Sequence, residues 1–273
     1  MRSLRKIILI AASALLAGGC SAVHPAAHAT GHPTGDPQSS TTARTTRPRL
    51  PPGRFAVSGT DPVEPNSSQD TRAQATAACR PRVLRSDQTL GDTTAAGFTI
   101  AGAPAAAQLL AHFLAGTGTP VRFGPRSPIA RQARASRPFR ALNRGIQADI
   151  LARLRAGRTS VRLPASALAP VLFAVPGSSQ DLYLSFRGTQ GLDLSGAGTI
   201  TRHGYAGTLT YVIRDSYGFP PDDQLLGIGT AMRYLQVNCG SPQTHGGARW
   251  FPDSITVTVP FRHSINKRPS PPA

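Results

Sequence analysis

The sequence predicts an α+β domain in which N-terminal helices precede a mainly antiparallel β-sheet, with one disulfide. Two observations predict this class. Apolar residues between 104 and 157 recur at helical spacing, whereas the segments after Gly157 alternate or form short apolar runs, as strands do. Helices followed by strands with short connections favour an α+β arrangement. We expect one domain over 72–265, because roughly 190 residues suffice for a single hydrophobic core.

Helices are expected where start and stop signals flank helical spacing. Pro104 opens a helix that ends before Gly116. Ser127 and Ser136 each stand shortly before a proline and are predicted to cap two further helices, the second of which ends at Gly157. The apolar stripe of that second helix is Phe139, Leu142, Ile146, Ile150 and Leu154, and shorter helices are expected over 72–79 and 225–237.

Strands are expected after Gly157, where the period of the pattern changes to two. Residues 254–259 alternate strictly between polar and apolar and give the clearest signal. His203-Gly204 marks a turn between two strands. The other expected strands cover 160–163, 171–175, 181–186, 192–195 and 207–213.

The first residues of the chain are typical of an export signal. Arg2, Arg5 and Lys6 precede an apolar run over 7–17, and small residues follow it. A basic segment, a short apolar run and small residues together mark a secretory signal peptide. The run is shorter than the roughly 20 residues that a membrane-spanning helix needs, which argues against an uncleaved anchor.

Residues 15–20 read Leu-Leu-Ala-Gly-Gly-Cys and resemble the lipobox of bacterial lipoproteins. In that family the cysteine accepts a diacylglyceryl group and becomes the mature N-terminus. The resemblance covers the export segment alone, and it departs from the family pattern at Ala17, where a large aliphatic residue is usual. It implies that 1–19 is a lipoprotein signal peptide and that a lipid on Cys20 anchors the protein to the outer face of the cytoplasmic membrane. A signal peptide with an unmodified cysteine near its cleavage site is the alternative.

Low-complexity sequence follows the export segment. Residues 20–71 are rich in Ala, Pro, Thr, Ser and Gly and have almost no apolar periodicity. Such a segment buries too little apolar surface to offset its ordering entropy, so a disordered tether is predicted. Residues 266–273 are rich in proline and are expected to form a disordered tail.

The chain has three cysteines, Cys20, Cys79 and Cys239. If Cys20 is acylated, the other two remain in an oxidising compartment and are expected to form one disulfide. Closing so long a loop would stabilise the fold by about 4 to 5 kcal/mol in the chain-entropy model. Two separately buried thiols are the alternative. A zinc site is not expected, because neither cysteine belongs to a C-x-x-C pair.

The formal net charge is +17, and nearly all the basic residues are arginine. A bias toward Arg, Ala, Gly and Pro is typical of high-GC Gram-positive bacteria, so the charge by itself is weak support for a ligand. A cationic exported protein is nevertheless attracted to anionic lipid and wall polymers, whereas export makes nucleic acid an unexpected partner. Arg137, Arg140 and Arg144 are predicted to share one helical face as the anionic-surface site. A merely solvated helix face is the alternative.

The densest polar cluster, residues 214–223, falls between a predicted strand and a predicted helix. Asp215, Tyr217, Asp222 and Asp223 are the candidate catalytic residues, because a loop on a rigid support can present a general base or a cation ligand. A strand followed by Asp-x-Tyr faintly resembles the active-site segment of colicin M-like toxins, which cleave a lipid-linked wall precursor. The downstream His-Arg pair of that family is missing here. In the structural alternative Asp222 or Asp223 caps the helix, Tyr217 and Phe219 pack, and Asp215 pairs with an arginine.

The sequence contains no recognisable catalytic motif. Residues 186–189 invite comparison with lipases, but the chain has no G-x-S-x-G nucleophile elbow. No metal and no cofactor are expected. We therefore predict a non-enzymatic, lipid-anchored binding module of the cell envelope. The alternative is an envelope-directed enzyme or toxin-like domain that uses the loop from Asp215 to Asp223.

Overall fold

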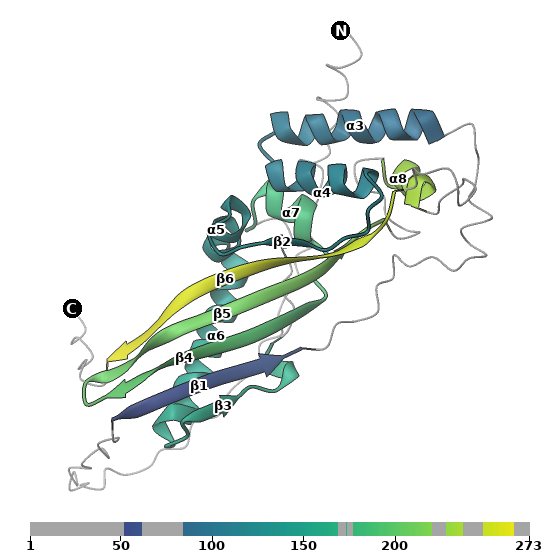
Figure 1. The fold of residues 1–273 in the computed structure, drawn as a ribbon. Helices are drawn as coiled ribbons and strands as arrows, with labels where there is room; N and C mark the ends of the chain where they lie inside the picture. Colours follow the sequence, from purple (N-terminus) through teal and green to yellow (C-terminus); the bar gives the residue numbers. More distant parts are fainter. Residues whose placement is uncertain are drawn as a thin grey trace, which may run out of the picture. The chain divides into compact units, whose positions relative to one another are not determined.

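The computed structural model describes residues 52–61, 84–168, 173, 177–219, 228–236 and 248–264. Within these residues, helices and a six-stranded sheet form the predicted α+β arrangement (Figure 1). Cys20, Cys79 and Cys239 lie outside the described residues, as do the predicted helix over 72–79 and the predicted tail. The lipid anchor and the disulfide therefore stay predictions.

The sheet is mixed, with strand order β2-β6-β5-β4-β1-β3. Its three central pairings are antiparallel, and the two outer pairings, β2 with β6 and β1 with β3, are parallel. The strands are β1 (Gly53–Thr60), β2 (Val121–Phe123), β3 (Ser160–Arg162), β4 (Gly191–Thr201), β5 (Gly204–Tyr217) and β6 (Phe251–Ser264). The helices are α3 (Leu84–Ile100), α4 (Pro104–Leu114), α5 (Pro128–Ala135), α6 (Arg137–Arg155), α7 (Gln180–Phe186) and α8 (Gly229–Gln236), with a 3-10 turn at Ala165–Ala167.

The prediction of a disordered tether over 20–71 is wrong for residues 53–60, which form the strand β1. The strand pairs with β4 on one side and β3 on the other, so it is an interior strand of the sheet. Phe55 and Val57 face the core at 3% and 4% exposure. Their period-two spacing is a strand signal, but the proline-rich sequence around it favours disorder. The described fold accordingly begins with a strand, and not with a helix.

The prediction of a strand over 181–186 is wrong, because these residues belong to the helix α7. Ser179 caps the helix, since its Oγ accepts a hydrogen bond from the Leu182 amide at 3.2 Å. Asp181 Oδ1 accepts a hydrogen bond from the Ala106 amide at 2.9 Å, in the first turn of α4. An apolar run this short does not distinguish helix from strand by its pattern, and the contact with α4 is long-range, so the sequence could not reveal it.

The other expected elements are largely confirmed. α4, α5 and α6 lie where the signals place them, and the Oγ atoms of Ser127 and Ser136 accept the capping hydrogen bonds. β4, β5 and β6 contain three of the other predicted strands, and β3 covers the predicted strand over 160–163 except for its last residue. α8 lies inside the predicted helix over 225–237. Of the predicted strand over 171–175, only Phe173 is described, and it is buried. α3 and β2 were not predicted, because α3 contains four threonines and two glycines, which are poor helix formers, and β2 has only three residues.

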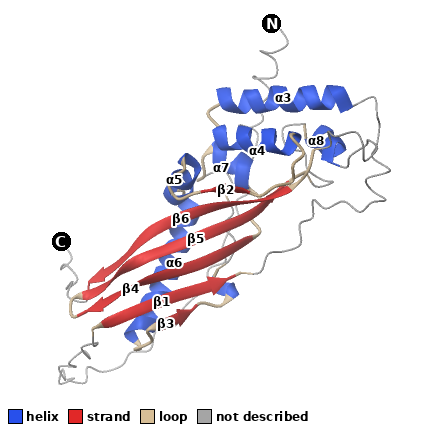
Figure 2. Ribbon diagram, viewed as in Figure 1, coloured by secondary structure: helices blue, strands red, loops and turns tan. Residues whose placement is uncertain are grey.

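α6 covers one face of the sheet, and that face holds the core. Phe139, Ile146, Ile150 and Leu154 of the helix are at most 2% exposed, and the ring of Phe139 lies 5.1 Å from that of Tyr211 on β5. The opposite face carries half-buried Ser and Thr side chains, as in antiparallel sheets with one solvated face. α3, α4, α7 and α8 gather at the end of the sheet where β5 ends and β6 begins (Figure 2).

Candidate functional site

Asp215 and Tyr217, two of the predicted catalytic residues, lie on β5 and not in a loop. Both point to the core side of the strand, as Ile213 does, because residues two apart share a face. Asp222 and Asp223 lie outside the described residues. The strand is longer than predicted, and this extension places the first two candidates in the sheet.

Tyr217 belongs to an aromatic cluster. Its ring stacks on that of Phe251 with centroids 5.5 Å apart and an interplanar angle of 22°. Phe113 and Phe219 meet the same ring edge-on, at 6.1 and 5.9 Å. Tyr217 is only 7% exposed, so its ring packs as the structural alternative expected.

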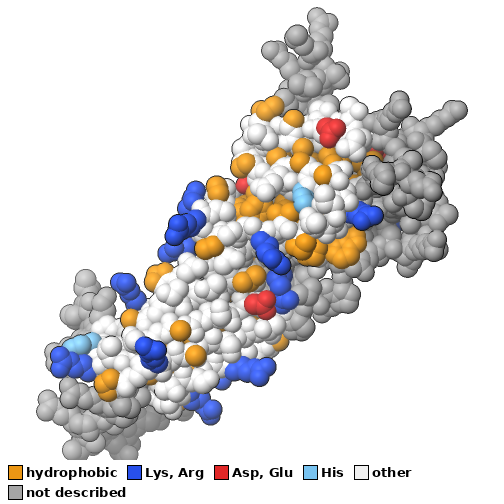
Figure 3. Space-filling view, viewed as in Figure 1, with side chains coloured by type: hydrophobic (Ala, Val, Ile, Leu, Met, Phe, Trp, Pro, Cys, Tyr) orange, Lys and Arg blue, Asp and Glu red, His pale blue; other side chains and the backbone are white. Residues whose placement is uncertain are grey.

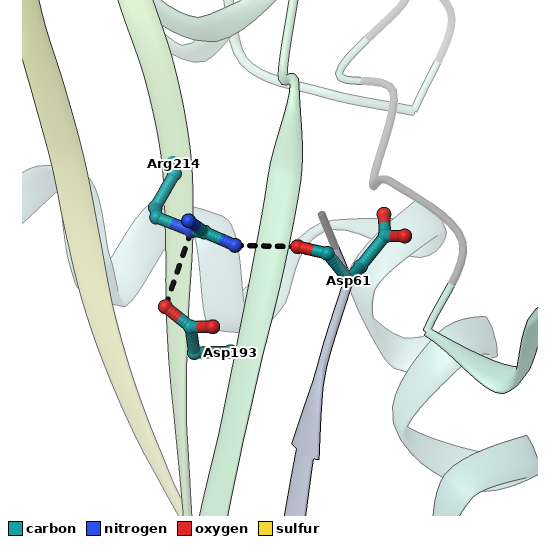
Figure 4. Close-up of polar contacts among 3 residues, drawn as sticks. All are labelled: Asp61, Asp193 and Arg214. Carbon is teal, nitrogen blue, oxygen red and sulfur yellow. Dashed lines mark hydrogen bonds and ion pairs between the residues drawn. The ribbon is translucent and has the colours of Figure 1, made fainter. Parts of the chain in front are cut away.

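Arg214 does not pair with Asp215, although the two are neighbours in the sequence. Neighbouring residues of a strand point to opposite faces, and Arg214 lies on the solvated one. There its Nε lies 3.1 Å from Oδ2 of Asp193 on β4, and its Nη2 donates to the carbonyl oxygen of Asp61 at 2.5 Å (Figure 4). Arg214 thus ties the end of β1 to β4 and β5.

A second carboxylate, which the sequence analysis missed, faces Asp215 from β6. Asp253 is its direct partner in the register, and both lie on the core side, at 9% and 3% exposure. Asp215 Oδ1 accepts a hydrogen bond from the Ser216 amide at 2.8 Å. The carboxylate of Asp253 makes no well-formed hydrogen bond, although the backbone amides of Asp253 and Tyr217 lower its pKa in part. The alternation of 254–259, extended back past Ile255, would have predicted that Asp253 points inward.

Burial controls the protonation of this pair. It raises the pKa of Asp215 to about 7, although the Ser216 amide and the charge of Arg187 lower that pKa in part. It also raises the pKa of Asp253 well above the ordinary value, and the neighbouring Asp215 raises it further. Two carboxyl groups side by side in a low-dielectric site do not both ionise readily, so the pair retains a proton near neutral pH.

The turn after α7 lies against this carboxyl pair. Gly188 is exposed, and a Cβ built on it would stand 3.7 Å from Asp215 Oδ1. Arg187 is half-buried beside it and supplies the positive charge that Asp215 feels. The site can therefore hold and release a proton. A substrate would have to displace this turn to touch Asp215.

The predicted basic surface lies on the outer side of α6. Arg137, Arg140 and Arg144 are all exposed, and a helical wheel places Arg137 and Arg144 opposite the buried stripe. Asp149, the acid of the same helix, is five residues from Arg144 and thus roughly 140° away around the axis. Within the described residues, none of the three arginines forms an ion pair.

Further arginines extend this surface onto α5. Arg131 and Arg134 are exposed on that helix, and Arg126 is exposed just before it. Figure 3 shows blue arginine side chains gathered over α5, with no red carboxylate among them. α5 and α6 are consecutive and in contact, with Ser136 ending one and capping the other. The cations of the two helices therefore lie on one continuous part of the protein.

Other features of the described residues offer less chemistry. A half-open depression of about 330 Å³ is lined by 58–60 and 162–165, with Arg162 as its one charged side chain. Across the part of the chain that the structure describes, no three His, Cys, Asp or Glu side chains come together as a metal site would require. In the same part, every helix is too short or too polar to cross a membrane.

Comparison with known proteins assigns no family to this fold or to its sites. No family model matches the chain, and neither does any curated protein or solved structure. The function is therefore argued from the residues themselves.

Proposed function

We propose that this protein is an exported, lipid-anchored, non-enzymatic binding module that docks on anionic lipid or wall polymer at the outer face of the cytoplasmic membrane. The observation that supports this proposal best is the exposed row of Arg137, Arg140 and Arg144 on α6, with no acidic partner among the described residues. The export signal and the lipobox-like Cys20 favour a location where anionic head groups and polymers are found.

The packing of α6 against the sheet holds the helix, and the arginines on its outer side, in a fixed position. Four large apolar residues anchor the helix to the sheet, and Asn143 Oδ1 accepts a hydrogen bond from the Tyr211 hydroxyl at 2.9 Å. A basic residue near a charged membrane contributes about 1 kcal/mol, so three fixed arginines would supply about 3 kcal/mol, or roughly a hundredfold in affinity. Salt screens such contacts, so the binding should weaken steeply as ionic strength rises.

The alternative, an envelope-directed enzyme or toxin-like domain, rests on the carboxyl pair of Asp215 and Asp253. A carboxyl group with its pKa raised to about 7 is suited to general acid catalysis. A catalytic group must however reach its substrate. Both side chains are at most 9% exposed, and the turn at Gly188 lies against Asp215. The exposed arginines meet that requirement, and for this reason binding is the proposal that we favour.

Vesicle co-sedimentation tests the proposal. The chain from residue 21 onward, which keeps β1 but lacks the lipid site, is mixed with vesicles of phosphatidylcholine alone or with about one third phosphatidylglycerol, at about 0.05 and 0.5 M salt. We expect retention on the anionic vesicles at low salt only. Isolated cell walls in place of vesicles test the polymer as the anionic surface.

Matched variants decide which arginines are responsible. Changing Arg137, Arg140 and Arg144 together to Gln should weaken binding by roughly a hundredfold. Changing Arg54, Arg162 and Arg249 to Gln removes the same charge from exposed positions elsewhere and should have a much smaller effect. Equal losses of binding in both triple variants would mean that binding depends on net charge and not on the position of the α6 arginines. Absence of retention on both vesicles and walls would refute the proposal.

A further inference from the structure

The end of the sheet far from the α3, α4, α7 and α8 helices brings together three polar side chains from separate elements. Arg155 is the last residue of α6, Tyr205 is near the start of β5, and His263 is near the end of β6. Tyr205 and His263 are direct partners in the register of β5 with β6. The Arg155 Nη2 atom lies 2.7 Å from His263 Nε2.

The contact between Arg155 and His263 fixes the protonation of the imidazole. A guanidinium has only donors, so Nε2 must be the acceptor and His263 must be neutral. Partial burial and the charge of Arg155 both lower the pKa of His263, which agrees with this state. Arg155 has no carboxylate partner among the described residues and uses an imidazole in its place.

Tyr205 adds an unused donor at the same place. It is 2% exposed, and its hydroxyl has no hydrogen-bond partner. Burial raises the pKa of Tyr205, and the nearby charge of Arg155 lowers it in part, which places the guanidinium within electrostatic reach of the phenol. A buried hydroxyl without a partner costs free energy in the folded protein unless a ligand or water satisfies it.

A second arginine–histidine contact lies at the same end of the sheet. In the turn between β4 and β5, the Arg202 Nε donates to His203 Nε2 at 2.9 Å. Figure 3 shows blue arginine and pale blue histidine side chains side by side at this end. The end of the sheet is thus rich in cations and imidazoles, and no described carboxylate forms an ion pair with them.

We propose that Arg155, His263 and Tyr205 form a binding site for a tetrahedral oxyanion of the phosphate type. An oxygen of the anion replaces His263 Nε2 as the acceptor of the guanidinium N–H. The imidazole then takes a proton from solvent and donates its Nε2–H to a second oxygen, and the Tyr205 hydroxyl donates to a third. Arg155 is exposed and His263 is half-buried, so the anion meets these two first and reaches the buried Tyr205 hydroxyl by displacing the Arg155 guanidinium from His263. Donors from three separate elements suit a phosphate with several oxygens better than the two oxygens of a planar carboxylate.

The test follows the His263 imidazole by NMR while inorganic phosphate is added to the chain from residue 21 onward, with chloride at equal ionic strength as the control. Phosphate should raise the pKa of His263, because it stabilises the imidazolium, and binding should strengthen as pH falls through that pKa. Arg155→Gln should weaken phosphate binding by about tenfold or more, and Tyr205→Phe by a smaller factor. Arg262→Gln, which removes an exposed charge next to His263 on the other face, should leave binding unchanged.

Two further arms distinguish the form of the phosphate and separate this site from the α6 arginines. Soluble glycerol phosphate and phosphatidylglycerol vesicles show whether the phosphate is free or belongs to a lipid head group. The triple Gln variant of Arg137, Arg140 and Arg144 should keep the phosphate response, so the failure of one proposal is distinguishable from the failure of the other. A titration of His263 that is the same in phosphate and chloride, or an equal loss in Arg155→Gln and Arg262→Gln, would overturn this inference.

Discussion

At the scale of single residues, the facing carboxyl groups of Asp215 and Asp253 are the least expected feature of the core. Both occupy positions in a row that otherwise holds aromatic and aliphatic side chains, between Ile213 and Tyr217 on β5 and between Phe251 and Ile255 on β6. Burying a charge there is costly, whereas burying a protonated carboxyl group is much less so. The folded state is therefore most stable when Asp215 and Asp253 are protonated.

The pair predicts that the protein becomes less stable as pH rises. The pKa of Asp215 goes from an ordinary 3.8 to about 7 on folding, so the folded state binds more protons than the unfolded state between those values. The contribution of Asp215 to stability is thus fully present below pH 3.8 and is lost as pH rises from there through about 7. Burial shifts the pKa of Asp87 and of Asp181 upward as well, which adds to the trend. Urea unfolding at a series of pH values measures it.

Asp253→Asn identifies the residue responsible. The amide resembles a protonated carboxyl group in shape and lacks its titration, so the variant should be more stable than the parent at pH 8 and should show a shallower fall between pH 5 and 8. Asp149→Asn removes an exposed carboxylate from α6 and should leave the pH profile as it is. His263 opposes the trend weakly, because its lowered pKa favours folding at higher pH. Stability that increases from pH 5 to 8 would contradict the assignment.

At the scale of elements, β1 shows how tertiary contacts turn a weak local pattern into a strand. The Phe55 ring lies 5.6 Å from that of Phe261, edge to face. Gly198 and Gly207 leave room for it, since a Cβ on Gly198 would stand 2.5 Å from the ring. Glycine weakens a strand, but Gly198 on β4 and Gly207 on β5 leave the space in which the Phe55 ring from β1 packs.

Phe55→Ala tests the strand against the tether. The Phe55 ring is 3% exposed, so its removal should destabilise the fold by about 3 to 5 kcal/mol. Arg54→Ala, on the exposed side of the same strand, is the control and should change stability by less than about 0.5 kcal/mol. Thermal or urea unfolding measures both. If residue 55 lay in a disordered tether, the two variants would be equally stable.

The successes among the elements have a local physical cause. Ser127 and Ser136 cap their own helices through atoms three residues away, so the capping signal is present in the sequence. α7 differs, because Asp181 caps a helix 75 residues away in the chain. The carboxyl pair likewise joins residues on two strands far apart in sequence, and the register that aligns Asp215 with Asp253 is a property of the whole sheet.

At the scale of the whole molecule, the proposed location of the protein rests on Cys20 and its flanking sequence. Cys20→Ala removes the thiol that the lipobox-like sequence offers for acylation, so the expected result is a shift of the protein from the membrane fraction to the soluble exported fraction. If the α6 arginines bind the membrane as we propose, they hold part of the variant there at low salt, so fractionation is compared at low and high salt. Unchanged membrane fractionation of the variant at high salt would rule out the lipid anchor.

The sequence alone determined the features that depend on neighbours along the chain. These are the α+β class, the capped helices, and the arginines of α6 that share an exposed side, since helical spacing alone sets that side. The export signal stays a prediction from the sequence. Tertiary structure alone decided which acids meet, which face Arg214 takes, and where Arg155, Tyr205 and His263 converge. The reason is physical: strand pairing and register bring together residues distant in sequence, and burial among those partners sets their protonation.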